Sequence, residues 1–409
     1  MAEWITTTLE ECTDILGDGL HGTPKYTENG EYAFVNGNNL VDGEILIKKE
    51  TKRVDYSQYD KYKKPLTNRT ILVSINGTLG NVGVYGSEKI ILGKSACYFN
   101  VKESVDKDFI YYIVSSPTFK QYLESNATGT TIKNISLKQM REYTFELPEI
   151  GEQKRISSVL RKIDEKIKNN RAINNNLEQQ AQAIFKEWFI DNPENNEWST
   201  GTFSELIKST LNGDWGKEAP TGNNTEKVYC IRGADIPEVK AGNKGKMPTR
   251  YILPKNFVKK QLTAGDIVVE ISGGSPTQST GRCTAITQSL LDRYDSGMVC
   301  TNFCKAIKPK EGYSLFIYYY WQYLYGKGVF FSYENGTTGI KNLDFSGFIE
   351  TETILIPPVD KIIAFDDYCK SIFNQIFANG KQNEHLAVLR DTLLPKLMSG
   401  ELDVSDIDL

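Results

Sequence analysis

The 409-residue sequence contains few of the residues that build catalytic and metal sites. It has only two histidines, His21 and His385, and its seven cysteines include no Cys-x-x-Cys pair. Cys300 and Cys304 are the closest pair, and no histidine lies near them, which favours reduced thiols over structural zinc. With no visible pairing of a nucleophile and a base, the sequence disfavours a hydrolase.

Long apolar stretches are also missing. No segment approaches eighteen uncharged apolar residues, and the start, MAEWITTTLEE, has neither the basic nor the apolar region of a signal peptide. We therefore expect a cytoplasmic chain that does not cross a membrane. The net charge of −4 gives no global basic footprint of a nucleic-acid binder, and 39% hydrophobic residues are ordinary for a soluble chain of two or three domains.

Nucleotide and methyl-donor motifs are missing as well. Leu355-Ile356-Pro357-Pro358-Val359 has two prolines without the polar and aromatic neighbours of an amino-methyltransferase loop. Gly93-Lys94-Ser95 resembles the end of a phosphate-binding loop, but Glu88 stands where its first glycine belongs. Because a carboxylate there would repel phosphates, we expect no bound nucleotide. With the cysteine and histidine pattern above, we expect no cofactor and no metal in this chain.

The sequence does contain an internal repeat. GTTIKN at 129–134 returns as GTTGIKN at 336–342, and each copy is followed by an apolar strand, a proline and a long helix. The offset between equivalent residues is 194 at Trp4 and Trp198 and reaches 209 at Pro148 and Pro357. About eleven extra residues enter the second copy between its Leu262-Thr263 segment and its Gly-Thr-Thr loop. A chain built from two copies of one unit suits a target with two parts.

Both long helices carry a coiled-coil pattern, with seam positions in alternating steps of four and three. The first seam is Ile156, Leu160, Ile163, Ile167, Asn170, Asn174, Leu177, Ala181, Ile184, Trp188, and the second is Phe365, Cys369, Ile372, Ile376, Asn379, Asn383, Leu386, Arg390, Leu393, Leu397. All ten positions are 209 residues apart. Buried seam asparagines fix register at a cost in stability, so we predict an antiparallel helix pair in which Asn170, Asn174, Asn379 and Asn383 meet. The alternative is that each helix packs only on its own domain.

The segments before each helix have the pattern of a β-rich domain. Short β-branched or aromatic runs alternate with Gly and Asn turns, and a helical stretch follows in each copy, Phe109–Val114 and Leu315–Trp321. Phe316, Tyr319, Tyr320 and Tyr323 share one helical face, which predicts core packing rather than a binding stripe. The expected strands are residues 32–35, 70–75, 82–85, 97–101, 227–231, 266–271 and 304–307.

Polar loops and basic clusters mark the candidate interface. Lysines and arginines gather before the equivalent Leu-Thr segments, at 48–64 and 240–260, which suits phosphate contacts but also a solvated face. Loops rich in Asn, Thr, Ser and Gly carry the mixed donors and acceptors that contact base edges, although they also suit ordinary connections. The candidates in the first copy are His21, Thr23, Lys25, Asn36, Asn38, Ser74, Asn76, Thr78, Lys94, Thr130, Thr131 and Lys133. Those in the second copy are Trp215, Lys217, Arg232, Ser272, Ser275, Thr277, Gln278, Arg282, Thr337, Thr338 and Lys341.

Taken in order, these motifs resemble the specificity subunit of a type I restriction-modification enzyme. The resemblance covers nearly the whole chain, and the segments that carry it are Asp18–Pro24, Asn76–Gly80, Gly129–Ser136, Leu147–Ile156, Gln179–Phe189 and Leu393–Leu402.

The resemblance implies an α+β chain with two β-rich target recognition domains, residues 1–149 and 191–357, joined by two long spacer helices, residues 150–190 and 358–409 with the C-terminal tail. The implied partners are double-stranded DNA with a bipartite sequence, two methyltransferase subunits and, through the complex, restriction and translocase subunits. Such a subunit is not catalytic, and S-adenosylmethionine, ATP and Mg would bind only to its partners. A duplicated β-domain scaffold that binds proteins, without DNA specificity, is the alternative.

Overall fold

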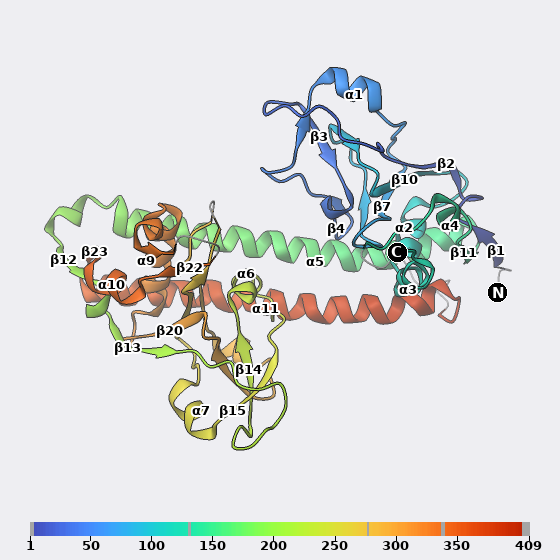
Figure 1. The fold of residues 1–409 in the computed structure, drawn as a ribbon. Coiled ribbons are helices and arrows are strands. Elements are labelled where there is room, and N and C mark those ends of the chain that lie inside the picture. Colours follow the sequence, from blue (N-terminus) through green and yellow to red (C-terminus); the bar gives the residue numbers. More distant parts are fainter. Residues whose placement is uncertain (1–3, 130–131, 276–277, 337–339, 403–409) are drawn as a thin grey trace. The chain divides into compact units, whose positions relative to one another are not determined.

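A computed structural model describes residues 4–129, 132–275, 278–336 and 340–402 (Figure 1). The chain divides into two compact units: unit 1 comprises residues 1–165 and 386–409, and unit 2 comprises residues 166–385. Among the described residues, none of the helices is both long enough and apolar enough to span a bilayer.

Short strands form most of unit 1. They are β1 Ile5–Thr8, β2 Thr13–Asp18, β3 Tyr32–Val35, β4 Leu40–Val41, β5 Glu44–Ile45, β6 Arg53–Val54, β7 Thr70–Ser74, β8 Val82–Val84, β9 Ile90–Leu92, β10 Ala96–Val101 and β11 Thr144–Leu147. The main sheet has the order β2-β10-β7-β8 with antiparallel neighbours, and a smaller sheet has the order β6-β3-β9. In the smaller sheet β3 is antiparallel to β6 and parallel to β9. Two further strand pairs are β1 with β11 and β4 with β5.

The short helices of unit 1 begin at polar caps. They are η1 Gly37–Asn39, α1 Tyr56–Tyr62, α2 Lys107–Ser115, α3 Pro117–Asn126 and α4 Leu137–Arg141. The Asp106 side chain accepts from the Phe109 amide at the start of α2, and Ser116 does the same for Phe119 at the start of α3. These caps direct Phe109 and Phe119 into the main core, where both are fully buried with Phe99 of β10.

Unit 2 has an equivalent set of strands. They are β12 Ser199–Thr202, β13 Ile207–Asn212, β14 Glu226–Ile231, β15 Thr249–Ile252, β16 Ile267–Glu270, β17 Ser272–Gly273, β18 Cys283–Ala285, β19 Gly297–Cys300, β20 Cys304–Pro309, β21 Glu334–Asn335, β22 Lys341–Leu343 and β23 Thr353–Ile356. The main sheet, β13-β20-β16-β18, and the smaller sheet, β15-β14-β19, repeat the orders and directions of unit 1, and β12 pairs with β23 as β1 pairs with β11. The predicted repeat and all seven predicted strands are therefore confirmed. The sheet β17-β22-β21 of unit 2 has its counterpart in unit 1 in two single bridges, which join Asn134 to Asn76 and to Thr128.

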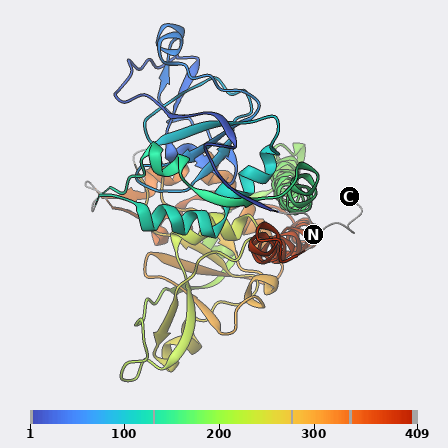
Figure 2. The same cartoon turned by 90° about the vertical axis from the view of Figure 1, so that its right-hand side faces the viewer.

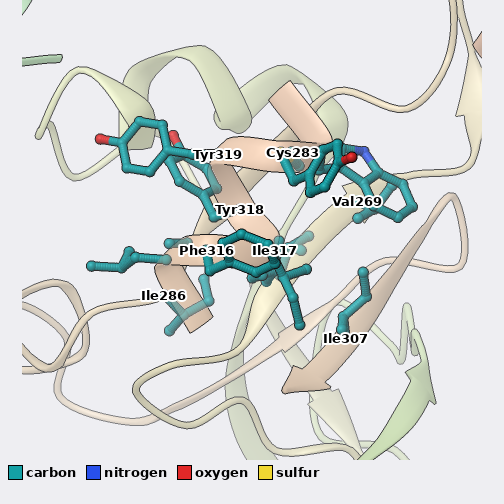
Figure 3. Packing of buried hydrophobic residues seen from close by; sticks show 14 of the residues in the cluster. Val269, Cys283, Ile286, Ile307, Phe316, Ile317, Tyr318 and Tyr319 are labelled. Atoms are coloured by element: carbon teal, nitrogen blue, oxygen red, sulfur yellow. The ribbon is translucent and has the colours of Figure 1, made fainter. Parts of the chain in front are cut away.

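The helices of unit 2 surround an aromatic core. They are η3 Pro193–Glu197, η4 Phe203–Glu205, η5 Gly233–Asp235, α6 Ile236–Lys240, α7 Pro254–Lys260, α8 Gln288–Leu291, α9 Ser314–Gly326, η6 Val329–Tyr333 and α10 Phe345–Thr351. Figure 3 shows Phe316, Ile317, Tyr318 and Tyr319 of α9 packed with side chains of β16, β18 and β20. The prediction that this aromatic stretch forms core is confirmed, and the buried surface extends around the helix, since Trp321 is also fully buried.

Two long helices cross the boundary between the units: α5 Ile150–Phe185, continued by the π-helix η2 Lys186–Ile190, and α11 Val359–Met398. Within unit 1, Ile156 and Leu160 of α5 share a core with Leu394 and Leu397 of α11. Arg390 of α11 donates to Asp164 of α5 (2.8 Å), and the other carboxylate oxygen of Asp164 accepts from Tyr112 of α2 (2.8 Å). The helices thus pair with each other and with the β domain.

Within unit 2, the seam asparagines meet. Asn170 Nδ2 donates to Asn383 Oδ1 at 2.9 Å, and Asn379 Nδ2 donates to Asn174 Oδ1 at 2.8 Å. Residue numbers rise along α5 as they fall along α11, so the pair is antiparallel. Figure 2 looks nearly along the axes of the two helices. The predicted pairing and its asparagine contacts are confirmed. Asn174 Nδ2 also donates to the carbonyl of Ala241, which fastens the turn after α6 to the helix pair.

Candidate nucleic-acid interface

Four loops of unit 1 converge beyond the ends of strands β2, β3, β7 and β9. The amide of Leu20 donates to Leu92 O (2.7 Å), the amide of Gly93 donates to Val35 O (2.8 Å), and the amide of Ile75 donates to Ser95 O (3.0 Å). Residues 18–25, 36–39, 74–81 and 93–95 are therefore held together by backbone hydrogen bonds. With the described residues of 128–134, we call them the first loop cluster.

The segment 128–134 joins this cluster through the loop after β7. Gly77 N donates to Lys133 O (2.9 Å), and Asn76 Nδ2 donates to Asn134 Oδ1 (3.0 Å). Thr128 and Asn134 exchange backbone hydrogen bonds of 2.8 and 2.9 Å, which hold the two ends of the segment together. Lys133 is thereby placed beside Asn76. The candidates Thr130 and Thr131 lie outside the described residues.

Most of the candidates in the first loop cluster are accessible to solvent. His21, Thr23, Lys25, Asn38, Thr78, Lys94 and Lys133 are exposed, while Asn36 and Asn76 are half-buried. His21 Nε2 lies 2.5 Å from Asp18 Oδ2. Ser74 differs, because it is fully buried and its hydroxyl donates to Thr78 O (2.7 Å) and accepts from Asn81 N (2.8 Å). Its side chain shapes the loop from within, which conflicts with the predicted direct contact.

A second loop cluster in unit 2 is built on the same backbone frame. It comprises the described residues of 212–217, 232–235, 271–282, 301–303 and 334–342. Asp214 N donates to Cys300 O (2.8 Å), Thr301 N to Ile231 O (3.0 Å) and Ile271 N to Phe303 O (2.9 Å). These are the counterparts of the three bonds in unit 1.

One glycine in each cluster makes the frame possible. A Cβ atom added to Gly19 would lie 2.3 Å from Leu92 O, and one added to Gly213 would lie 1.8 Å from Thr301 O. The backbones approach too closely at both places for any larger residue. The framework is therefore repeated, while the side chains around it differ: Trp215 takes the place of His21, and Arg232 takes the place of Asn36.

The predicted cations of the second loop cluster are held in ion pairs. Arg232 Nε lies 2.8 Å from Asp235, Arg282 Nη2 lies 2.7 Å from Glu270, and Lys341 Nζ lies 2.7 Å from Glu334. Burial alone would raise the pKa of Glu334, but Lys341 and Thr280 lower it overall by bonding the charged form. Because their carboxylate partners are buried, these cations stabilise the loops from within, and they are poorer candidates for phosphate contacts than Lys94 or Lys133.

The other candidates of unit 2 lie in the same cluster. The Trp215 ring is covered on one face by the Arg250 guanidinium, 3.9 Å from the ring centroid. Lys217 is exposed, and its backbone exchanges hydrogen bonds with Tyr251. Ser272 donates to Asn342 Oδ1, and Ser275 Oγ accepts from the amide of the exposed Gln278. Thr277, Thr337 and Thr338 lie outside the described residues.

Sequence reasoning missed Phe303, which belongs to the second loop cluster and is 59% exposed. Phenylalanine is ordinarily a core residue, so it was not among the polar candidates. Aligning the two repeats could have found it, because it stands opposite Ser95 and directly follows Asn302, the counterpart of Lys94.

Cysteine and acidic side chains form no ligand cluster in the part of the chain that the structure describes. The seven cysteines are free and buried. Burial raises the pKa of Cys230, Cys283 and Cys304 to about 12, so these thiols stay protonated near neutral pH.

A repeated frame that carries two different sets of loop side chains defines a recognition protein with two modules. Comparison with known proteins agrees. Residues 1–179 match the family model described as type I restriction modification DNA specificity domain. These residues therefore belong to that domain family, and the whole chain is similar to type I restriction enzyme specificity subunits.

Relatives extend the similarity beyond the matched domain. The type I restriction enzyme MjaIX specificity subunit of Methanocaldococcus jannaschii is 26% identical, over 94% of this chain and 87% of its own length. The type I restriction enzyme HindI specificity subunit of Haemophilus influenzae is 23% identical, over 72% of this chain and 77% of its own. The fold is shared with the crystal structure of a type I restriction-modification system S subunit from M. genitalium, with a TM-score of 0.55, 19% identity and coverage of 97% and 96% of the two chains.

Proposed function

We propose that this chain gives a type I restriction-modification complex its DNA sequence specificity, with each loop cluster contacting one half of a bipartite target. The observation that carries the proposal is the pair of loop clusters: the same backbone bonds recur at counterpart positions, and the side chains they present differ. Two similar modules with different polar side chains suit two different half-sites, because base edges are distinguished by donor and acceptor patterns.

The exposed polar residues of the two clusters are our candidates for DNA contact. Lys25, Lys94, Lys133 and Lys217 present ammonium groups suited to phosphate, and the exposed asparagine, threonine, histidine and glutamine side chains suit base edges. Ser74, Arg232, Arg282 and Lys341 act instead as supports, since their polar atoms are engaged inside the loops.

The remaining parts of the chain serve assembly. Residues 1–149 and 191–357 are the two target recognition domains, and residues 150–190 and 358–409 form the helical spacer with the C-terminal tail. Two methyltransferase subunits dock on this chain and bring restriction and translocase subunits with them. The chain itself is not catalytic: S-adenosylmethionine, ATP and Mg bind to its partners, and the complex works in the cytoplasm.

Methylation mapping tests the proposal. Methylated adenines would be mapped across the genome in three kinds of cells. The first have the unaltered chain, the second lack the chain, and the third have a chain in which Gly-Ser segments replace the loops of one cluster while the other cluster is unchanged. We expect one bipartite methylated sequence that disappears without the chain. Unchanged methylation in cells lacking the chain would refute the function.

A lysine substitution tests the interface itself. Lys133→Ala in the complex with methyltransferase partners should weaken DNA binding to cognate and non-cognate duplexes alike. It should also lower the slope of log K against log salt by about one, since one phosphate contact is lost. Lys102→Ala is the matched control. Lys94 in the first loop cluster precedes β10, whereas Lys102 follows the other end of this strand, away from the cluster, and its ammonium group donates to Glu11 O. Equal salt slopes for both variants would remove Lys133 from the interface.

A further inference from the structure

Phe303 is a large apolar side chain in the middle of a polar loop cluster. Its ring is 59% exposed, although Thr301 and Cys304 on either side of the turn are buried. Isolated surface phenylalanines are common, so exposure alone carries no conclusion. What distinguishes Phe303 is its position between the loops of Arg232 and Ser272.

The backbone of Phe303 is part of the frame. Its carbonyl accepts from Ile271 N (2.9 Å) and Ser272 N (3.2 Å), while Cys304 N donates to Thr301 O (2.9 Å) to close the turn. On its other side, Thr301 N donates to Ile231 O, next to Arg232. The carbonyl and the neighbouring amides hold the turn, so the phenyl ring itself is not needed to build it.

Unit 1 makes the same turn with a different side chain. Ser95 O accepts from Ile75 N (3.0 Å) and Ala96 N donates to Gly93 O (3.0 Å), which are the counterpart bonds. The Ser95 hydroxyl accepts from Gly37 N and donates to Asn36 Oδ1, so it turns inward to the neighbouring loop. In unit 2 this position presents an apolar ring to solvent instead.

We propose that Phe303 is a specificity-determining residue that contacts the C5-methyl group of a thymine in the half-site bound by unit 2. This inference rests on the proposed function. The thymine methyl is the apolar group on the major-groove edges of base pairs, and phenylalanine is among the residues that contact it. Phe303 belongs to a loop cluster whose other exposed residues include Lys217 and Gln278, so its ring can supply an apolar contact that these polar side chains cannot make.

The test removes the methyl group from DNA and the ring from the protein. The complete complex with methyltransferase partners is used, on duplexes carrying the methylated sequence found in cells. Each thymine in the half-site of unit 2 is replaced in turn by uracil, which lacks only the C5-methyl. At one position the unaltered complex should lose about three- to tenfold in affinity, the size expected for one buried methyl.

Phe303→Ala should bind the thymine and uracil duplexes at that position equally well, and Phe303→Leu should keep part of the preference. Val258→Ala is the control, because Val258 lies on α7 outside the loop cluster and is 80% exposed. It should discriminate thymine from uracil as the unaltered chain does. Since the Phe303 ring is exposed, the alanine variant should keep the melting temperature of the unaltered chain.

The outcomes separate this inference from the function. A complex without salt-dependent DNA binding would refute the proposed function. Normal binding with no sensitivity to any uracil, a half-site without thymine, or a preference unchanged in Phe303→Ala would refute only the role of Phe303. A fluorescence experiment with 2-aminopurine in the half-site gives one more refuting outcome. If the probe reported an unstacked base with the unaltered chain and not with Phe303→Ala, the ring would act as a wedge between bases and would not contact a thymine methyl group.

Discussion

Gly380 offers a test in which helix propensity and packing predict opposite signs. It lies in the interior of α11, where replacing glycine by alanine normally stabilises a helix by about 1 kcal/mol. However, a Cβ atom at this position would lie 1.9 Å from Gly242 O and 2.6 Å from the Gly242 carbonyl carbon, in the turn that follows α6. Backbone cannot move aside as a flexible side chain can.

The size of the effect follows from what the turn holds. To make room for the methyl group, residues 241–242 must retreat by more than 1 Å, which strains the hydrogen bond from Asn174 Nδ2 to Ala241 O (3.1 Å) and the one from Arg293 Nη1 to Gly242 O (2.7 Å). Overpacking costs about 1 to 3 kcal/mol, and a weakened bond to a charged donor adds about 1.5 to 3 kcal/mol. After subtracting the propensity gain, we expect Gly380→Ala to lower the free energy of unfolding by about 1.5 to 5 kcal/mol.

Calorimetric melting of the chain measures this effect, with Gly151→Ala as the matched control. Gly151 lies in the first turn of α5, and an added Cβ there would meet only Glu149 Oε1, at an ordinary 3.8 Å. The control should melt at the same temperature as the unaltered chain or slightly above it, and Gly380→Ala clearly below. If Gly380→Ala were as stable as the control, the close approach of the turn to α11 would be refuted.

Two further predictions concern buried polar groups. Replacing Asn170 and Asn383 together by leucine removes both partners of one bond and should leave the melting temperature unchanged or raised. Asn174→Leu leaves the Ala241 carbonyl without its donor and should cost about 1 to 3 kcal/mol by the same measurement; equal melting of the two variants would contradict this distinction. Lys341→Met should destabilise the chain at pH 7. In the folded chain the pKa of Glu334 is lowered from its ordinary value of 4.5, so the charged carboxylate stabilises the fold at pH values above 4.5, and this stabilisation is lost as the pH falls through the folded pKa. The difference in melting temperature between this variant and the unaltered chain should therefore shrink below about pH 4.5, and a constant difference across pH 3 to 7 would contradict the role of the pair.

The helix pair could be predicted from sequence because its pattern is local and repeated. Heptad spacing defines a seam, and a constant offset aligns the two seams without any knowledge of the fold. The asparagines stand at four matching positions, so their meeting followed from register alone. The bond from Asn174 to Ala241 could not be predicted in this way, because it joins the helix to a turn that carries no periodic signal.

The strands could be predicted for a similar reason, since β-branched runs bounded by glycine and asparagine are a local signal. The roles of individual loop residues were harder to predict. The sequence shows that Arg232, Arg282 and Lys341 are basic, but only the folded loops bring Asp235, Glu270 and Glu334 against them. Phe303 was missed for the opposite reason: its residue type indicates a core, and its exposure depends on the path of two neighbouring loops.

The turn at Ser95 and Phe303 has a consequence for how such proteins change over time. Its geometry is maintained by carbonyl and amide groups that every residue except proline possesses, so the side chain at this position can be exchanged without rebuilding the turn. A serine and a phenylalanine already occupy the two copies. Under the proposed role of Phe303, a new preference for DNA would arise by a single codon change in one unit, while the scaffold and the preference of the other unit would be inherited intact.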